Sequence, residues 1–117
     1  MNDLIQRLVN AIFRQEGMPA DFKNPGNLRG APWLEKPVIS AATNFWLPAS
    51  RAEGVAGAAH VVALRIAEGE SLGTLISEWA PPSDENATET YIQHVKEWAG
   101  IPDENVPLRN FLENSAS

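Results

Sequence analysis

The stretch that decides the fold is Phe13-Arg14-Gln15-Glu16-Gly17, which is followed by the run Asn24-Pro25-Gly26-Asn27-Leu28-Arg29. The residues before it predict an amphipathic helix because apolar side chains recur at helical spacing. Those side chains are Leu4, Ile5, Leu8, Val9, Ile12 and Phe13. Asn2 or Asp3 can cap the start of this helix. Gly17 and Pro19 predict that it ends at Gln15 or Glu16.

Glu16 is the best candidate for a catalytic residue. At about 100° per residue, it points within about 20° of Ile5 and Val9, on the apolar face of the helix. Burial and the negative end of the helix dipole both disfavour an ionised carboxylate there. A carboxyl group that stays protonated near neutral pH is what a general acid requires. The alternative is a glutamate that reaches water from a frayed helix end, or that accepts a hydrogen bond from a loop amide.

Composition predicts one globular domain over residues 1–117, with a loose tail at 113–117. The chain is 44% hydrophobic and contains four Trp and four Phe, which is typical of a folded core. It has no cysteine, which excludes disulfides and thiolate chemistry. The net charge of −6 argues against nucleic acid as a partner. The same charge provides no attraction to anionic membranes or anionic cell-wall polymers.

No apolar run approaches the roughly 18 residues of a membrane span, and the N-terminus does not have the pattern of a signal peptide. We therefore expect synthesis in the bacterial cytoplasm, without a membrane partner. If the protein acts outside, it would be carried in a virion or released to the periplasm and cell wall.

The segment from Gly17 to Ala49 is predicted to be one long irregular loop, since five prolines interrupt it. Trp33, Phe45 and Trp46 favour an ordered loop that packs against the helices. Val38-Ile39 and Asn44 to Leu47 can form short extended pieces, at most a small β-hairpin.

Three further helices are predicted from their caps and apolar stripes. Ser50 and Glu53 form a capping box for a second helix, with Val55, Ala59, Val62 and Ile66 inward and Gly69 at its end. Its small residues Ala56 to Ala59 would let another helix approach closely. Ser71 caps a third helix, which is stopped by Pro81-Pro82. Asn86-Ala87-Thr88-Glu89 is a second box that opens a fourth helix, closed by Gly100. The expected fold class is mainly α, with four helices around one long loop.

Several other polar residues have a structural and a functional interpretation. The Asn24 to Asn27 run is a rigid turn that could also hold its Asn side chains toward a polar ligand. Arg29 could pair with Glu16, with a substrate or with a surface acid. Tyr91 lies on the core stripe of the fourth helix, where its hydroxyl needs a partner. His60 and His94 share no metal-ligand spacing, so we expect no metal site and no cofactor.

The ordered motifs of this chain resemble those of small lysozyme-like phage and prophage proteins, a family similar to lytic transglycosylases. The resemblance covers residues 11 to 108 and rests on several short elements. These are Arg14-Gln15-Glu16-Gly17, Asn24-Pro25-Gly26-Asn27-Leu28-Arg29, Phe45, Glu53-Gly54, Gly73-Thr74-Leu75-Ile76, Trp79-Ala80-Pro81-Pro82, Glu85-Asn86-Ala87-Thr88, Tyr91-Ile92 and Gly100. The chain departs from the family in having Lys23 where a second Asn is often found.

The resemblance implies a lysozyme-like fold and cleavage of peptidoglycan between N-acetylmuramic acid and N-acetylglucosamine. Glu16 matches the single catalytic acid of that family. Asn24, Asn27 and Arg29 match its cleft-lining loop, and Tyr91 matches a tyrosine that faces the acid. The implied substrate is peptidoglycan or a chitooligosaccharide.

Most glycosidases use two carboxylates, one on each side of the glycosidic bond. This sequence offers only Glu16 as a candidate, and a single acid suits a non-hydrolytic reaction. The alternative function is a lysozyme-like module that binds glycan or builds a virion without cutting. The sequence does not decide between hydrolysis and transglycosylation. It also leaves open the peptidoglycan chemotype and the oligomeric state.

Overall fold

The computed structural model describes residues 3–17, 23–24, 26, 28–81 and 87–112. Within these residues the chain is mainly helical, as predicted. It contains α1 (Asp3–Glu16), α2 (Arg51–Ala67), α3 (Leu72–Trp79), α4 (Thr88–Ala99) and a short 3₁₀ helix, η2 (Leu108–Phe111). None of the described helices is both long enough and apolar enough to cross a membrane.

The helix ends follow local capping chemistry at most of the predicted positions. Gly17 and Gly100 adopt the left-handed conformation after α1 and α4, with φ of 65° and 69°. Ser50 accepts a hydrogen bond from the Glu53 amide, and the Glu53 carboxylate accepts one from the Ala49 amide. Ser71 accepts a hydrogen bond from the Thr74 amide at the start of α3. These caps are confirmed.

The fourth helix is not capped by the first residue of its predicted capping box. The residue at the N-cap position of α4 is Ala87, which makes no side-chain capping bond. Asn86 lies outside the described residues. Thr88 instead donates its hydroxyl to the Ala80 carbonyl oxygen at 2.7 Å, which fastens the start of α4 to the end of α3.

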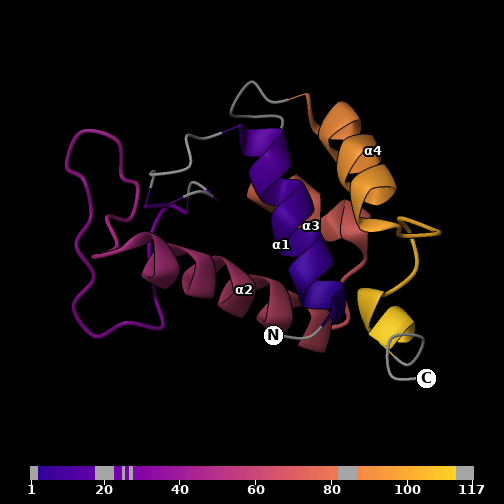
Figure 1. The fold of residues 1–117 in the computed structure, drawn as a ribbon, viewed down its shortest axis with the longest axis horizontal. Coiled ribbons are helices and arrows are strands. Elements are labelled where there is room, and N and C mark those ends of the chain that lie inside the picture. The colour runs from indigo at the N-terminus through magenta and orange to yellow at the C-terminus, as the bar shows by residue number, and fades with distance from the viewer. Residues whose placement is uncertain (1–2, 18–22, 25, 27, 82–86, 113–117) are drawn as a thin grey trace.

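α1 lies between α2 and α4 and packs on both, while α3 packs on α4 (Figure 1). The core between these helices is built from aliphatic side chains and the Tyr91 ring. Its fully buried large residues in the helices are Leu4, Leu8, Val9, Ile12, Val62, Leu72, Leu75, Ile76, Val95 and Leu108. Leu4, Leu8, Val9 and Ile12 belong to the apolar stripe predicted for the first helix, so that helix packs as its periodicity indicates.

The second helix buries Val62 and Ile66, as predicted, but the rest of its buried face differs from the prediction. Gly54, Gly57 and Ala58 are buried with Val62 and Ile66, whereas Val55 and Ala59 are partly exposed. A Cβ on Gly57 would lie 2.5 Å from a Trp46 ring carbon, and one on Gly54 would lie 1.7 Å from the Lys23 carbonyl oxygen. The small residues therefore admit the long loop and its tryptophan.

The long loop lies beside the first turns of α2, away from α4 (Figure 1). Ile39 and Trp46 form one antiparallel bridge, and hydrogen bonds from Ser40 to Phe45 and from Leu47 to Val38 flank it. This is the small hairpin that the sequence predicted. Trp46 is 1% exposed and joins the loop to the helical body.

Candidate functional site

Glu16 lines an open cleft between the helical body and the long loop. Its side chain is half-buried at the last residue of α1. The cleft has a volume of about 400 Å³. The loop side of the cleft is formed by Leu28, Arg29 and Phe45; the helical side is formed by Val61, Arg65, Leu75, Glu78, Trp79, Ala80 and Pro81. The apolar-face carboxylate predicted from helical geometry therefore borders a cavity large enough for a ligand.

Tyr91 lies close enough to Glu16 for the two groups to interact electrostatically. The residue is 4% exposed, and its hydroxyl has no hydrogen-bond partner among the described residues. Burial, together with the Glu16 carboxylate, raises the pKa of the Tyr91 hydroxyl above its usual range. The hydroxyl is therefore a neutral donor at every physiological pH. A buried donor without a partner is costly in a folded protein, so its retention beside Glu16 points to a functional site.

The last turn of α1 is fixed from the side facing α4. His94 Nδ1 lies 2.6 Å from Gln15 Oε1, and the His94 ring stacks on Trp98 with 4.9 Å between centroids. The Arg14 guanidinium lies 4.1 Å from the Trp98 ring centroid. These contacts hold the residues just before Glu16, so the carboxylate is presented from a rigid element.

Trp79, at the end of α3, holds the loop through a hydrogen bond and a close contact. The Trp79 indole nitrogen donates to the Gly26 carbonyl oxygen at 2.9 Å. A Cβ on Gly26 would lie 2.9 Å from a carbon of the same ring, so any larger residue would push the turn outward. The glycine of the Asn-Pro-Gly-Asn run is thus required by the close approach of the indole.

The structure places Asn24 behind the cleft. Asn24 is 3% exposed, and its side-chain amide donates to the carbonyl oxygens of Leu28 and Trp46 at 3.0 and 2.9 Å. Its side-chain oxygen accepts from the Leu28 amide at 3.0 Å. Asn24 therefore joins the turn to the hairpin and does not line the cleft that contains Glu16. Asn27 lies outside the described residues.

Arg29 lines the same cleft as Glu16, as the resemblance implied. Its side chain is exposed, and the guanidinium carbon lies 5.4 Å from the Phe45 ring centroid. Of the site residues predicted from sequence, the structure thus brings together Glu16 and Arg29 along the cleft, with Tyr91 beside Glu16.

Glu78 is a second carboxylate in the cleft that sequence reasoning missed. It is 46% exposed and lies 3.4 Å from Arg65 Nε. Arg65 also pairs with Glu68 at 2.9 Å and approaches Glu70 at 3.9 Å. Burial and the Glu78 carboxylate raise the pKa of Glu70. The sequence shows Glu78 only as a polar residue at the end of a helix, with nothing to indicate that α2 would place an arginine opposite it.

His60 lies against the Trp33 ring, with 5.0 Å between the ring centroids. Within the described residues, no group of His, Cys, Asp or Glu side chains could hold a metal ion. The described residues that line the cleft therefore contribute carboxyl, guanidinium, indole and apolar groups.

Comparison of the chain with protein-family models, with curated proteins and with solved structures gave no match.

Proposed function

We propose that this chain cleaves the glycan strand of peptidoglycan between N-acetylmuramic acid and N-acetylglucosamine, without consuming water. The proposal is carried by one observation: a half-buried Glu16 at the end of α1 borders an open cleft and lies beside a buried tyrosine hydroxyl that has no hydrogen-bond partner in the part of the chain that the structure describes. The lysozyme-like order of motifs in the sequence supports the same assignment. Enzymes of this kind need one carboxyl group that can both give and take a proton.

In the first step, the Glu16 carboxyl group donates its proton to the glycosidic oxygen. The bond between that oxygen and C1 of the muramic acid breaks, and the acetamido oxygen of the same sugar attacks C1. In the second step, the Glu16 carboxylate takes the proton of the C6 hydroxyl. The O6 oxygen then bonds to C1 and displaces the acetamido oxygen, which leaves a 1,6-anhydromuramyl end and a protonated Glu16.

Tyr91 and Arg29 supply the polar groups around this reaction. The neutral Tyr91 hydroxyl is buried beside Glu16 and is not part of the cleft lining, so it acts on the Glu16 carboxyl group and not on the sugar. Its dipole stabilises the Glu16 carboxylate that forms in the first step. Arg29, held over Phe45 at the edge of the cleft, binds oxygen atoms of the sugar. Asn24 contributes indirectly, because its three hydrogen bonds fix the turn that carries Arg29. The role of Asn27 stays a prediction from the sequence.

The experiment is digestion of purified peptidoglycan, followed by mass spectrometry of the soluble fragments. Wild-type protein is expected to release fragments with 1,6-anhydromuramyl ends, and Glu16→Gln to release at least about 1,000-fold less. Glu35→Gln is the matched control, because Glu35 is exposed on the loop and does not line the cleft. Fragments with reducing ends would make the enzyme a hydrolase.

The alternative of a glycan-binding or virion module without catalysis gives a different result. In that case wild type and Glu16→Gln would release equally little soluble material while both bound peptidoglycan. That outcome would refute the catalytic proposal.

A further inference from the structure

A second groove lies on the loop, next to the cleft that contains Glu16. Its volume is about 590 Å³, which is within the range of ligand sites in proteins. Its walls are mainly apolar, and its rim carries the ammonium group of Lys23 and two hydroxyl groups. The residues that line it are Lys23, Asn24, Ser40, Thr43, Phe45, Trp46, Leu47 and Pro48.

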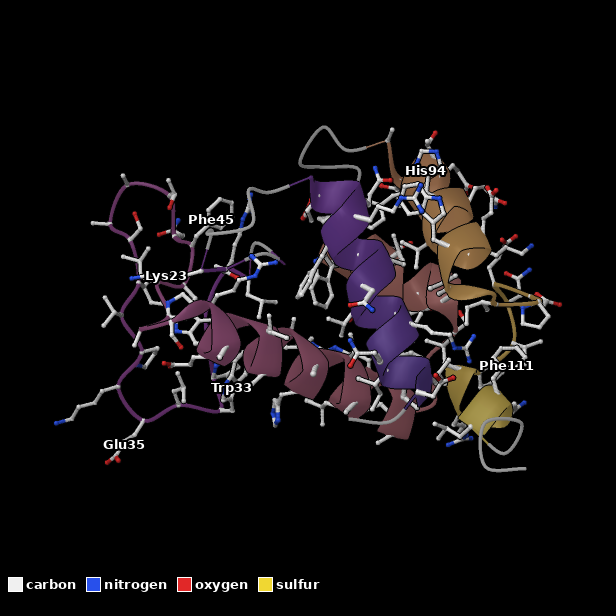
Figure 2. The ribbon with its side chains drawn as sticks, in the orientation of Figure 1. Lys23, Trp33, Glu35, Phe45, His94 and Phe111 are labelled. Carbon is white, nitrogen blue, oxygen red and sulfur yellow. The ribbon has the colours of Figure 1, made fainter. Side chains whose placement is uncertain are left out.

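Phe45 lines both the groove and the Glu16 cleft. Figure 2 shows Phe45 and Lys23 on the same lobe of the molecule, away from α4, the helix that carries His94. A ligand bound in the cleft can therefore continue past the Phe45 ring into the groove without leaving the surface of the loop.

The groove opens on the exposed apolar face of the hairpin. Leu47 pairs with Val38 across the hairpin through the hydrogen bond from the Leu47 amide. Their side chains are 50% and 62% exposed. Small apolar groups of a ligand can be buried against this pair, because two neighbouring exposed aliphatic side chains gain from being covered.

Lys23 gives the rim of the groove a positive charge in an acidic protein. The segment 23–51 contains four basic residues and one acidic residue, whereas the whole chain has a net charge of −6. The basic residues are Lys23, Arg29, Lys36 and Arg51. The groove thus combines apolar walls with a cation at its rim, which suits a ligand that carries both small aliphatic groups and carboxylates.

We propose that this groove binds the stem peptide of peptidoglycan while the attached glycan lies in the Glu16 cleft. This inference rests on the proposed function, because it takes the substrate from it. The stem peptide begins on the lactyl group of N-acetylmuramic acid, so it leaves the sugar at the cleft. Its alanine methyl groups match the face of Leu47 and Phe45, and its carboxylates match Lys23. The chain then prefers peptide-bearing glycan to a bare chitooligosaccharide.

The test measures binding by isothermal titration calorimetry with two probes. One is the disaccharide of N-acetylglucosamine and N-acetylmuramic acid that bears a tetrapeptide, and the other is the same disaccharide without peptide. The full chain with Glu16→Gln is used so that neither probe is cleaved. It is expected to bind the peptide-bearing probe at least about tenfold more tightly, a difference that a few well-placed contacts supply.

Lys23→Gln in the same background is expected to reduce this preference about threefold to tenfold, the effect of one partly exposed ion pair. Lys36→Gln is the matched control, because it removes the same charge from the same loop but does not line the groove. Equal affinity for the two probes would overturn the inference, and so would an equal loss in both lysine variants. Equal affinity together with sedimentation on phosphatidylglycerol vesicles would assign the apolar face to membranes instead.

Failure of the proposed function gives a separate result. If wild type releases no fragments from peptidoglycan but the Glu16→Gln chain still prefers the peptide-bearing probe, the groove inference holds and the catalytic proposal fails. If neither probe binds, the groove inference is refuted, while the catalytic proposal is still decided by whether the wild type releases anhydromuramyl fragments.

Discussion

Replacement of Tyr91 by Phe should make the protein more stable and less active. The change removes only the hydroxyl, which is buried and has no hydrogen-bond partner among the residues that the structure describes. An unsatisfied buried polar group costs about 1 to 3 kcal/mol, so its removal is expected to raise the free energy of unfolding by about 1 kcal/mol. For a domain of this length, that corresponds to a rise in Tm of about 4 °C. Thermal unfolding followed by circular dichroism measures the shift.

The activity of Tyr91→Phe should fall although its stability rises. The hydroxyl lies beside Glu16, and its removal takes away a fixed dipole that stabilises the Glu16 carboxylate in the proposed reaction. Loss of one preorganised polar group of this kind costs about 100-fold in kcat. The assay is the rate of anhydromuropeptide release, with KM measured separately so that a binding defect is not mistaken for a catalytic one. A variant that loses more than 1 kcal/mol of stability would show that the hydroxyl is satisfied in the folded protein, and the reasoning would be wrong.

Three further predictions concern the loop and the acidic groups near the cleft. Asn24→Ala should lower the free energy of unfolding by about 2 to 4 kcal/mol in urea titrations, because the buried Trp46 carbonyl and the Leu28 amide lose their partner. The Leu28 carbonyl keeps its hydrogen bond from the Trp46 amide. Asn110→Ala, on the exposed surface, should change the free energy of unfolding by less than about 0.5 kcal/mol. The raised pKa of Glu70 means that the folded chain binds its proton more tightly than the unfolded chain, so stability falls as pH rises through that pKa. Glu70→Gln should therefore stabilise the protein by about 0.5 kcal/mol at pH 7 and not at pH 4, and an equal effect at both pH values would contradict this cause. Glu78→Gln should keep anhydromuramyl products at a rate within about tenfold of wild type; a loss of about 1,000-fold would instead make Glu78 a second catalytic carboxylate.

The helices could be predicted from the sequence because their signals are local. Apolar periodicity placed α1, and a serine hydroxyl within three residues of its amide partner placed the starts of α2 and α3. The start of α4 was predicted less well. Thr88 bonds the Ala80 carbonyl, and that contact depends on how two helices meet.

In the candidate site, too, local features could be predicted from the sequence and long-range contacts could not. Helix geometry alone indicated that Glu16 would face apolar neighbours and that Tyr91 would be buried. The placement of Asn24 was missed, because the Trp46 carbonyl that it binds is 22 residues away in the chain. Glu78 was missed for a similar reason. Its partner Arg65 lies on α2, and only the tertiary fold brings the two side chains together.

The distribution of charge removes an objection to an anionic substrate. A net charge of −6 suggests repulsion from cell-wall polymers, yet the acidic residues are concentrated outside the loop. Segment 23–51 alone carries a net charge of +3. At physiological ionic strength, charges more than about 8 Å apart are largely screened from each other. A ligand in the cleft is therefore influenced mainly by the groups that line it and by the basic loop beside it. The net charge of the whole chain governs solubility, whereas the loop governs which ligands can approach Glu16.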